Sequence, residues 1–142
     1  MSEIFTLHPK LKADAAFVRD FPLSRVLLMN DARFPWLLLV PRRPNVTELH
    51  ELGECDRAAL TQEIVHAGEI LQSWARLRGG CDKLNIAMIG NMVPQLHVHI
   101  IARRKTDPLW PDAVWGRGDP VRYVADELKS VTAELAGRFD PQ

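Results

Sequence analysis

The chain has 142 residues, of which 46% are hydrophobic and 25% are charged, a composition typical of a soluble globular protein. Its 18 basic and 18 acidic residues cancel to a formal net charge of zero, so no overall field attracts nucleic acid or an anionic membrane surface. No apolar run is long enough to cross a bilayer, and the N-terminal residues lack the pattern of a secretory signal. We therefore expect a single domain over residues 1–142, located in the cytoplasm, with Cys55 and Cys81 as free thiols.

The first half of the chain predicts a β-hairpin followed by a long helix. Two apolar runs, residues 25–29 and 36–40, flank a polar turn and are typical of paired antiparallel strands. A helix is expected over residues 55–78, ended by Gly79 and Gly80. Apolar side chains recur along this helix at helical spacing: Leu60, Ile64, Ala67, Leu71 and Trp74.

The second half predicts two more strands and a last helix. The strands cover residues 83–89 and 96–103, and residues 106–118 are expected to form a loop. The helix is predicted to begin with Asp119 as its N-cap and Pro120 as its first residue. Its apolar face is expected to contain Val121, Val124, Leu128, Val131 and Leu135. These elements indicate an α+β fold, with an antiparallel sheet built from two hairpins, a long central helix and a C-terminal helix.

Two histidines, His97 and His99, lie in the last predicted strand, within the sequence QLHVHII (residues 95–101). Alternate side chains of a strand share a face, so both rings are expected on the face opposite Val98 and Ile100, roughly 6.5–7 Å apart. Three interpretations fit this spacing: a half-exposed strand that happens to carry histidines, a zinc site, or a site for nucleophilic or acid–base catalysis. The spacing alone does not choose among them.

The same segment, residues 95–101, resembles the signature of the histidine triad (HIT) family, His-φ-His-φ-His-φ-φ, with glutamine at the first position. The resemblance continues in LLLVPRRP at the end of the hairpin, in the long helix and in KLNIAMIGN before the histidine strand. It implies an α+β homodimer that binds nucleotides, purine nucleotides above all, and hydrolyses or transfers nucleoside monophosphates without a cofactor or a metal. Dinucleoside polyphosphates and nucleoside phosphoramidates are the implied substrates. The glutamine suggests a bacterial branch similar to diadenosine polyphosphate hydrolases.

Carried over residue by residue, the resemblance implies a role for five side chains. His97 is the expected nucleophile, which forms a covalent nucleotidyl-imidazole that water then hydrolyses. His99 is expected to contact the phosphate oxygens or the leaving group. Asn30 matches the residue that binds the ribose hydroxyls, and Asn85 and Asn91 match positions that hold the phosphate and orient the nucleophile.

The sequence differs from the family pattern at two supporting positions. Gln95 replaces the first histidine of the triad, and Trp36 occupies the position of a family histidine on the second hairpin strand. Gln95 is still expected to bind substrate, because its amide can donate and accept hydrogen bonds, although it cannot titrate. Arg103 is expected to contact the phosphate chain. The differences leave two other functions open, a nucleotide-binding module with little turnover and a nucleotidyltransferase.

Overall fold

A computed structural model describes residues 3–140, so the ends of the predicted domain, residues 1–2 and 141–142, lie outside the described residues. Five strands form one antiparallel sheet in the order β1-β2-β3-β5-β4. The strands are β1 (Ala15–Asp20), β2 (Ser24–Met29), β3 (Trp36–Pro41), β4 (Lys83–Ala87) and β5 (Val98–Arg103). The helices are α1 (Pro9–Asp14), α2 (Glu54–Arg76) and α3 (Ala125–Arg138), with a 3-10 turn η1 (Leu49–Glu51). The predicted α+β fold is confirmed.

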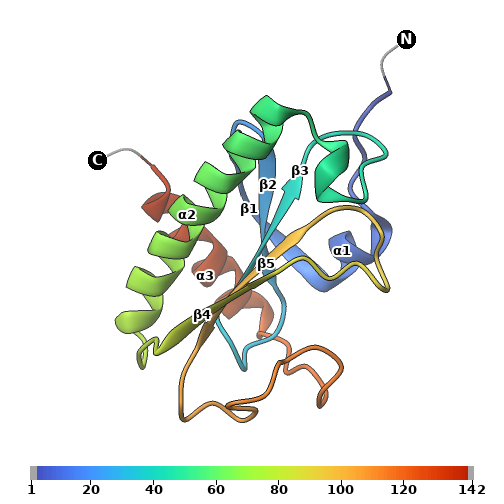
Figure 1. The fold of residues 1–142 in the computed structure, drawn as a ribbon. Helices are drawn as coiled ribbons and strands as arrows, with labels where there is room; N and C mark the ends of the chain where they lie inside the picture. The colour runs from blue at the N-terminus through green and yellow to red at the C-terminus, as the bar shows by residue number, and fades with distance from the viewer. Residues whose placement is uncertain (1–2, 141–142) are drawn as a thin grey trace.

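The two faces of the sheet are covered in different ways. Helix α2 crosses one face and contacts β3 and β5, and α3 packs beside it against β1 (Figure 1). Val98 and Ile100 point into the core on this side. A second hydrophobic cluster on the opposite face contains Trp36 and Ile101 and is covered by Leu11 of α1 and by Val114. Strand β5 is therefore buried on both faces, and the face that carries the histidines is not the half-exposed one of the first interpretation.

The hairpin and the central helix lie within two residues of their predicted bounds, as β2, β3 and α2. The next two strands are shorter than predicted, because β4 ends at Ala87 and β5 begins only at Val98. Residues 88–97 form a loop instead. Pro94 has no N–H to donate to a strand partner, which is consistent with the late start of β5. His97 consequently lies directly before β5, and His99 lies within it.

The sequence analysis did not predict α1 and β1. Helix α1 begins with Pro9 at its first position, and His8 Nδ1 accepts a hydrogen bond from the backbone N–H of Lys10. Strand β1 follows at once, without a glycine or proline between the two elements. As an edge strand it buries only Val18 fully, so it lacks the strong alternation that identifies a strand in a sequence.

The predicted start of the last helix at Asp119 is wrong, because α3 begins at Ala125 with Val124 as its N-cap. Val121 and Val124, expected on the apolar face, are 55% and 70% exposed. The backbone before α3 pairs with the β2–β3 turn: Ala32 N–H donates to the Val121 carbonyl at 2.6 Å, and Tyr123 N–H donates to Asn30 Oδ1 at 2.8 Å. These bonds hold the segment out of a helical conformation.

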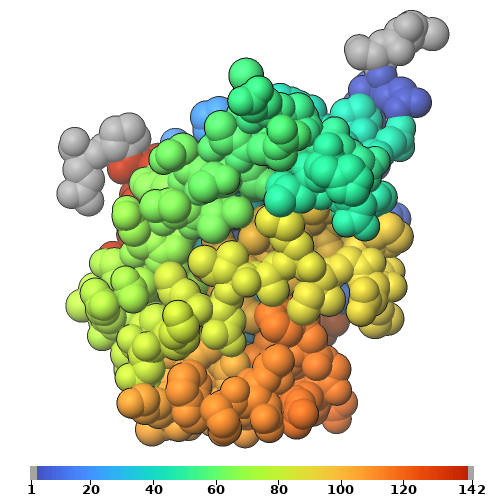
Figure 2. Space-filling view, viewed as in Figure 1, coloured from blue at the N-terminus to red at the C-terminus, as the bar shows by residue number. Residues whose placement is uncertain are grey.

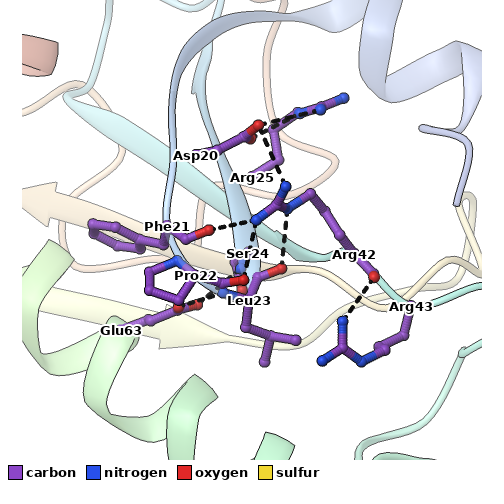
Figure 3. A network of polar contacts seen from close by, with 9 residues as sticks. All are labelled: Asp20, Phe21, Pro22, Leu23, Ser24, Arg25, Arg42, Arg43 and Glu63. Atoms are coloured by element: carbon purple, nitrogen blue, oxygen red, sulfur yellow. Dashed lines mark hydrogen bonds and ion pairs between the residues drawn. The ribbon is translucent and has the colours of Figure 1, made fainter.

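A buried carboxylate joins α2 to the β1–β2 turn (Figure 3). Glu63 of α2 is 7% exposed and accepts hydrogen bonds from the backbone N–H groups of Leu23, at 2.9 Å, and Ser24, at 3.0 Å. Arg42, just after β3, donates to the carbonyl oxygens of Phe21 and Leu23 from the other side. Between residues 3 and 140 no helix is long and apolar enough to span a membrane.

Candidate functional site

His97 and His99 lie next to each other at the start of β5 and are almost fully buried, with exposed fractions of 4% and 5%. Their ring centroids are 4.9 Å apart and the rings meet edge to face. The loop of residues 88–97 that precedes them runs beside α1 (Figure 1). The predicted placement of both rings on one side of the chain, opposite Val98 and Ile100, agrees with this geometry.

The orientation of His97 is set by the backbone of Gln95, two residues earlier. Its Nδ1 atom lies 2.6 Å from the carbonyl oxygen of Gln95. A carbonyl oxygen only accepts hydrogen bonds, so Nδ1 carries the proton and Nε2 keeps a free lone pair. Burial lowers the pKa of His97 below its ordinary value, against the opposing effect of this hydrogen bond and with a further lowering from the charge of His8. Near neutral pH the ring is therefore an unprotonated base with Nε2 as its reactive atom.

His99 is held by a different kind of partner. The indole Nε1–H of Trp36 on β3 donates to His99 Nδ1 at 3.1 Å. Burial lowers the pKa of His99 to about 4, assisted by the charge of His97 and opposed by a backbone hydrogen bond at Ile89. Trp115, from the segment after β5, meets the same ring edge to face at 5.2 Å. His99 is therefore neutral at physiological pH.

Two hollows meet at His97. The larger has a volume of about 720 Å³ and is bounded by four segments, which are α1, the β2–β3 turn, the 88–97 loop and residues 114–122. The smaller, of about 390 Å³, lies between η1 and the 88–97 loop. Ile89, Asn91 and His97 line both. Figure 2 shows the segment after β5 lying against the 88–97 loop on the surface of the molecule. A ligand that extended into both hollows would meet the imidazole of His97.

The described residues, 3–140, contain no group of three or more His, Cys, Asp or Glu side chains placed to hold a metal ion. Cys55 and Cys81 are free thiols, neither of them part of the site.

Comparison with protein families identifies the family to which the chain belongs. The HIT domain profile matches residues 10–106, which is more than half of the chain. The chain belongs to the HIT family. Proteins of this family are generally nucleotide-binding hydrolases and transferases.

Three solved structures of HIT proteins are similar to the chain over nearly its whole length. A histidine triad protein of Bradyrhizobium japonicum is 46% identical, with a TM-score of 0.88, and the match covers 96% of this chain and 98% of that one. One from Sinorhizobium meliloti 1021 is 39% identical, with a TM-score of 0.87 and coverage of 95% and 97%. One from Marinobacter aquaeolei VT8 is 40% identical, with a TM-score of 0.83 and coverage of 96% for both chains. The sequence has no significant match among functionally curated proteins.

Four of the residues expected at the HIT site line the larger hollow: Asn30, Asn91, His97 and His99. Asn30 is half-buried, and its Oδ1 atom already accepts the hydrogen bond from Tyr123. Its Nδ2 group therefore remains as a donor toward a ligand. Asn91 is exposed on the 88–97 loop, where the two hollows meet.

Gln95 connects the 88–97 loop to the N-terminal segment. Its Oε1 atom accepts from the backbone N–H of His8 and its Nε2 group donates to the carbonyl of Thr6, both at 2.9 Å. The side chain lines the smaller hollow but not the larger one. The amide that replaces the first histidine of the triad thus ties two segments of the fold together.

Asn85 and Arg103, expected at the phosphate chain, lie outside both hollows. Arg103 is 1% exposed and pairs through Nε and Nη2 with the carboxylate of Asp107, which is equally buried. Its Nη1 atom donates to Asn85 Oδ1 at 3.0 Å and to the Asp112 carbonyl at 2.8 Å. The expectation that this guanidinium is free for phosphate is wrong, because its donors are used to hold the turn after β5.

The structure also brings residues to the larger hollow that the sequence analysis did not assign to the site. Asp31 is 2% exposed and pairs with Arg33, and both line the hollow beside Asn30. The Arg33 hydrogen bonds lower the pKa of Asp31, although burial alone raises it. In the sequence, the spacing of Asp31 and Arg33 just after a predicted strand could have indicated this ion pair. Trp115 gave no such signal, since its contact with His99 depends on the course of the long loop.

Proposed function

We propose that this protein hydrolyses a nucleoside 5′-phosphate bond through a covalent nucleotidyl intermediate on His97. One observation carries the proposal: the 2.6 Å contact between His97 Nδ1 and the Gln95 carbonyl leaves Nε2 unprotonated where the two hollows meet. A buried imidazole with a lowered pKa is a competent nucleophile at neutral pH, because it does not have to lose a proton first.

The reaction then has two displacements at phosphorus. Nε2 of His97 attacks the α-phosphorus, the bond from phosphorus to the leaving oxygen, or to the leaving nitrogen of a phosphoramidate, breaks, and the electron pair departs with the leaving group. Water next attacks the same phosphorus, the phosphorus–nitrogen bond breaks, and its electron pair returns to Nε2. The products are a nucleoside monophosphate, the leaving group and one proton. Two displacements replace one difficult step by two easier ones.

The lining of the hollows supports a division of the substrate between them. The larger hollow contains the side chains of Trp36, Val114 and Trp115, which offer an apolar and aromatic surface for a purine nucleoside. Asn30 beside them can donate to a ribose hydroxyl. The smaller hollow has a more polar lining that includes Thr47, Asn91 and Gln95, and we assign it to the leaving group.

The proposal has three further parts. We propose that the chain belongs to a bacterial branch of the HIT family similar to diadenosine polyphosphate hydrolases, which is supported by the glutamine at position 95. We also propose that the single domain acts as a homodimer, which is supported by the outer edge of β4 and by Ile86, 49% exposed on it. The free thiols Cys55 and Cys81 suit the reducing cytoplasm, and that location stays a prediction.

Intact-protein mass spectrometry tests the proposal. The wild-type protein and His97→Ala are mixed with diadenosine tetraphosphate or with adenosine 5′-phosphoramidate and quenched at short times, and product nucleotides are followed in parallel. We expect AMP release and a transient adduct of one AMP on the wild type alone. AMP binding without adduct or product would indicate a binding module. New nucleotide conjugates in the presence of added phosphate or amine acceptors would indicate a transferase.

A further inference from the structure

The contact between Trp36 and His99 combines two buried groups of unequal hydrogen-bonding capacity. Trp36 is 6% exposed and His99 is 5% exposed, and the indole Nε1–H lies 3.1 Å from His99 Nδ1. An indole N–H can donate a hydrogen bond but cannot accept one. His99 Nδ1 must therefore accept, and the proton of the neutral ring lies on Nε2.

A protonated Nδ1 would be costly at this position. It would place two N–H donors against each other in a buried contact, where neither can turn to water. Among the described residues, His97 is the one titratable group that influences His99, since Trp36 and Trp115 carry no charge. Ile89 contributes a backbone acceptor, which must face Nε2 because Nδ1 is bound to Trp36, so a phosphate oxygen would share the Nε2–H with it. Within residues 3–140 no carboxylate stabilises an imidazolium there.

We propose that Trp36 is a positioning residue that locks His99 as a neutral Nε2–H hydrogen-bond donor for the reacting phosphate. The proposal rests on the function proposed above. The family histidine at this position can donate, accept or titrate, whereas tryptophan can only donate. At position 36 the chain therefore has a donor of fixed direction that cannot titrate.

The two histidines then have opposite tautomers. His97 carries its proton on Nδ1, bound to an acceptor, and His99 carries its proton on Nε2, because its Nδ1 is bound to a donor. Nε2 of His97 is a lone pair and Nε2 of His99 is an N–H group. With ring centroids 4.9 Å apart, one ring can attack phosphorus while the other donates to an oxygen on it.

Long-range ¹H–¹⁵N correlation spectra of the imidazole nitrogens test this assignment directly at pH 7. In the wild type we expect His99 with an unprotonated Nδ1 and a protonated Nε2, and His97 with the reverse pattern as an internal reference. Trp36→Phe keeps an aromatic ring but loses the donor, so His99 should become a mixture of tautomers. Trp115→Phe is the matched control, because Trp115 touches the same imidazole without a hydrogen bond to it, and the His99 tautomer should be unchanged.

A proton on Nδ1 of His99 in the wild type, or a Trp36→Phe spectrum identical to the wild type, would overturn the proposal. If Trp36→Phe does not fold, the wild-type protein still provides the test, through a scalar coupling across the hydrogen bond from Trp36 Nε1 to His99 Nδ1. Absence of that coupling, together with an indole proton that exchanges as fast as that of free tryptophan, also contradicts it.

Steady-state kinetics add a second measurement, the change in kcat relative to KM, which a role of Trp36 in packing alone would not alter selectively. We expect Trp36→Phe to lower kcat by roughly tenfold and to change KM by less than about threefold, since the donor acts on the reacting phosphate. The failures of the two proposals are distinguishable. Absence of an adduct on His97 would refute the hydrolase and leave the tautomer assignment standing, whereas a reversed tautomer with a normal adduct would refute only the role of Trp36.

Discussion

His97 Nδ1 and the carbonyl oxygen of Gln95 are 2.6 Å apart, so the imidazole proposed as the nucleophile is oriented by the main chain of the residue that replaces the first histidine of the triad. The side chain of Gln95 takes no part in this contact. The main-chain hydrogen bond explains how the sequence can change at this position without disturbing the tautomer of His97.

We predict that His97→Ala abolishes turnover and leaves AMP affinity within roughly tenfold of the wild type, because it removes the nucleophile and little of the hollow. Isothermal titration with AMP and a product assay measure the two quantities. A variant that still turns over substrate at an appreciable rate would contradict the assignment of the nucleophile.

Gln95→Ala should destabilise the protein by about 1–2 kcal/mol, because it removes two hydrogen bonds to the N-terminal segment, each of modest net value. Urea unfolding measures the change. Gln95→Glu keeps the acceptor for His8 N–H but replaces the donor to Thr6 by a second acceptor, so it should also be less stable than the wild type. Equal stability of all three proteins would show that this connection is dispensable.

The free energy of unfolding should decrease as the pH is lowered below about 6.5, the ordinary pKa of histidine. The pKa of His99 is about 4 in the folded protein and about 6.5 in the unfolded chain, so the unfolded chain binds the proton first as the pH falls. The stability that depends on a neutral His99 is fully present above pH 6.5 and is lost progressively between pH 6.5 and pH 4. From pH 7 to pH 5 we expect a loss of roughly 2 kcal/mol from this residue. His99→Asn, which cannot titrate, should show a shallower slope in urea unfolding over this range, and an unchanged slope would exclude His99 as its source.

Arg103→Met should lower the free energy of unfolding by roughly 3–5 kcal/mol, because it leaves the buried Asp107 carboxylate without a partner. Adding Asp107→Asn removes the orphaned charge and should recover part of the loss. In the folded fraction of each variant, measured with the mass-spectrometric assay, KM should stay within about threefold of the wild type. A large rise in KM with an unchanged free energy of unfolding would indicate that Arg103 does contact the phosphate chain of the substrate.

The leaving group offers a fifth prediction, which rests on the proposed role of Trp36. A neutral Nε2–H can donate a hydrogen bond but does not release a full proton near pH 7. A departing phosphate needs no proton, whereas a departing amine does. We therefore expect kcat/KM to be higher for diadenosine tetraphosphate than for adenosine 5′-phosphoramidate, and Trp36→His to narrow the difference. A preference for the phosphoramidate in the wild type would contradict this account.

The sequence predicted those parts of the fold that depend on regular spacing. The apolar runs of β2 and β3, the helical repeat of α2 and the alternation around His97 and His99 were all informative, because side-chain period determines which face is buried. The start of α3 was predicted wrongly because Asp119 and Pro120 match a helix start. The backbone just after them is instead bound by Asn30 and Ala32 of the β2–β3 turn, which lie far earlier in the chain.

In the candidate site, too, local sequence patterns could be predicted and long-range contacts could not. Two adjacent histidines on one side of a chain could be read from local sequence. The burial of Arg103 could not, since it depends on Asp107, Asn85 and a turn that brings the Asp112 carbonyl back to β5. Gln95 was expected to bind substrate, and both of its side-chain hydrogen bonds reach the segment just before α1, a helix that the sequence did not reveal.

The HIT domain profile ends at residue 106, and one wall of the larger hollow, residues 114–122, lies beyond it. The histidine strand therefore lies within the profile that defines the family, and the wall that faces it lies outside that profile. Under the proposed function, substitutions in that wall would alter which nucleoside fits without changing His97. Relatives that share the histidines are therefore expected to diverge in substrate range first through this segment.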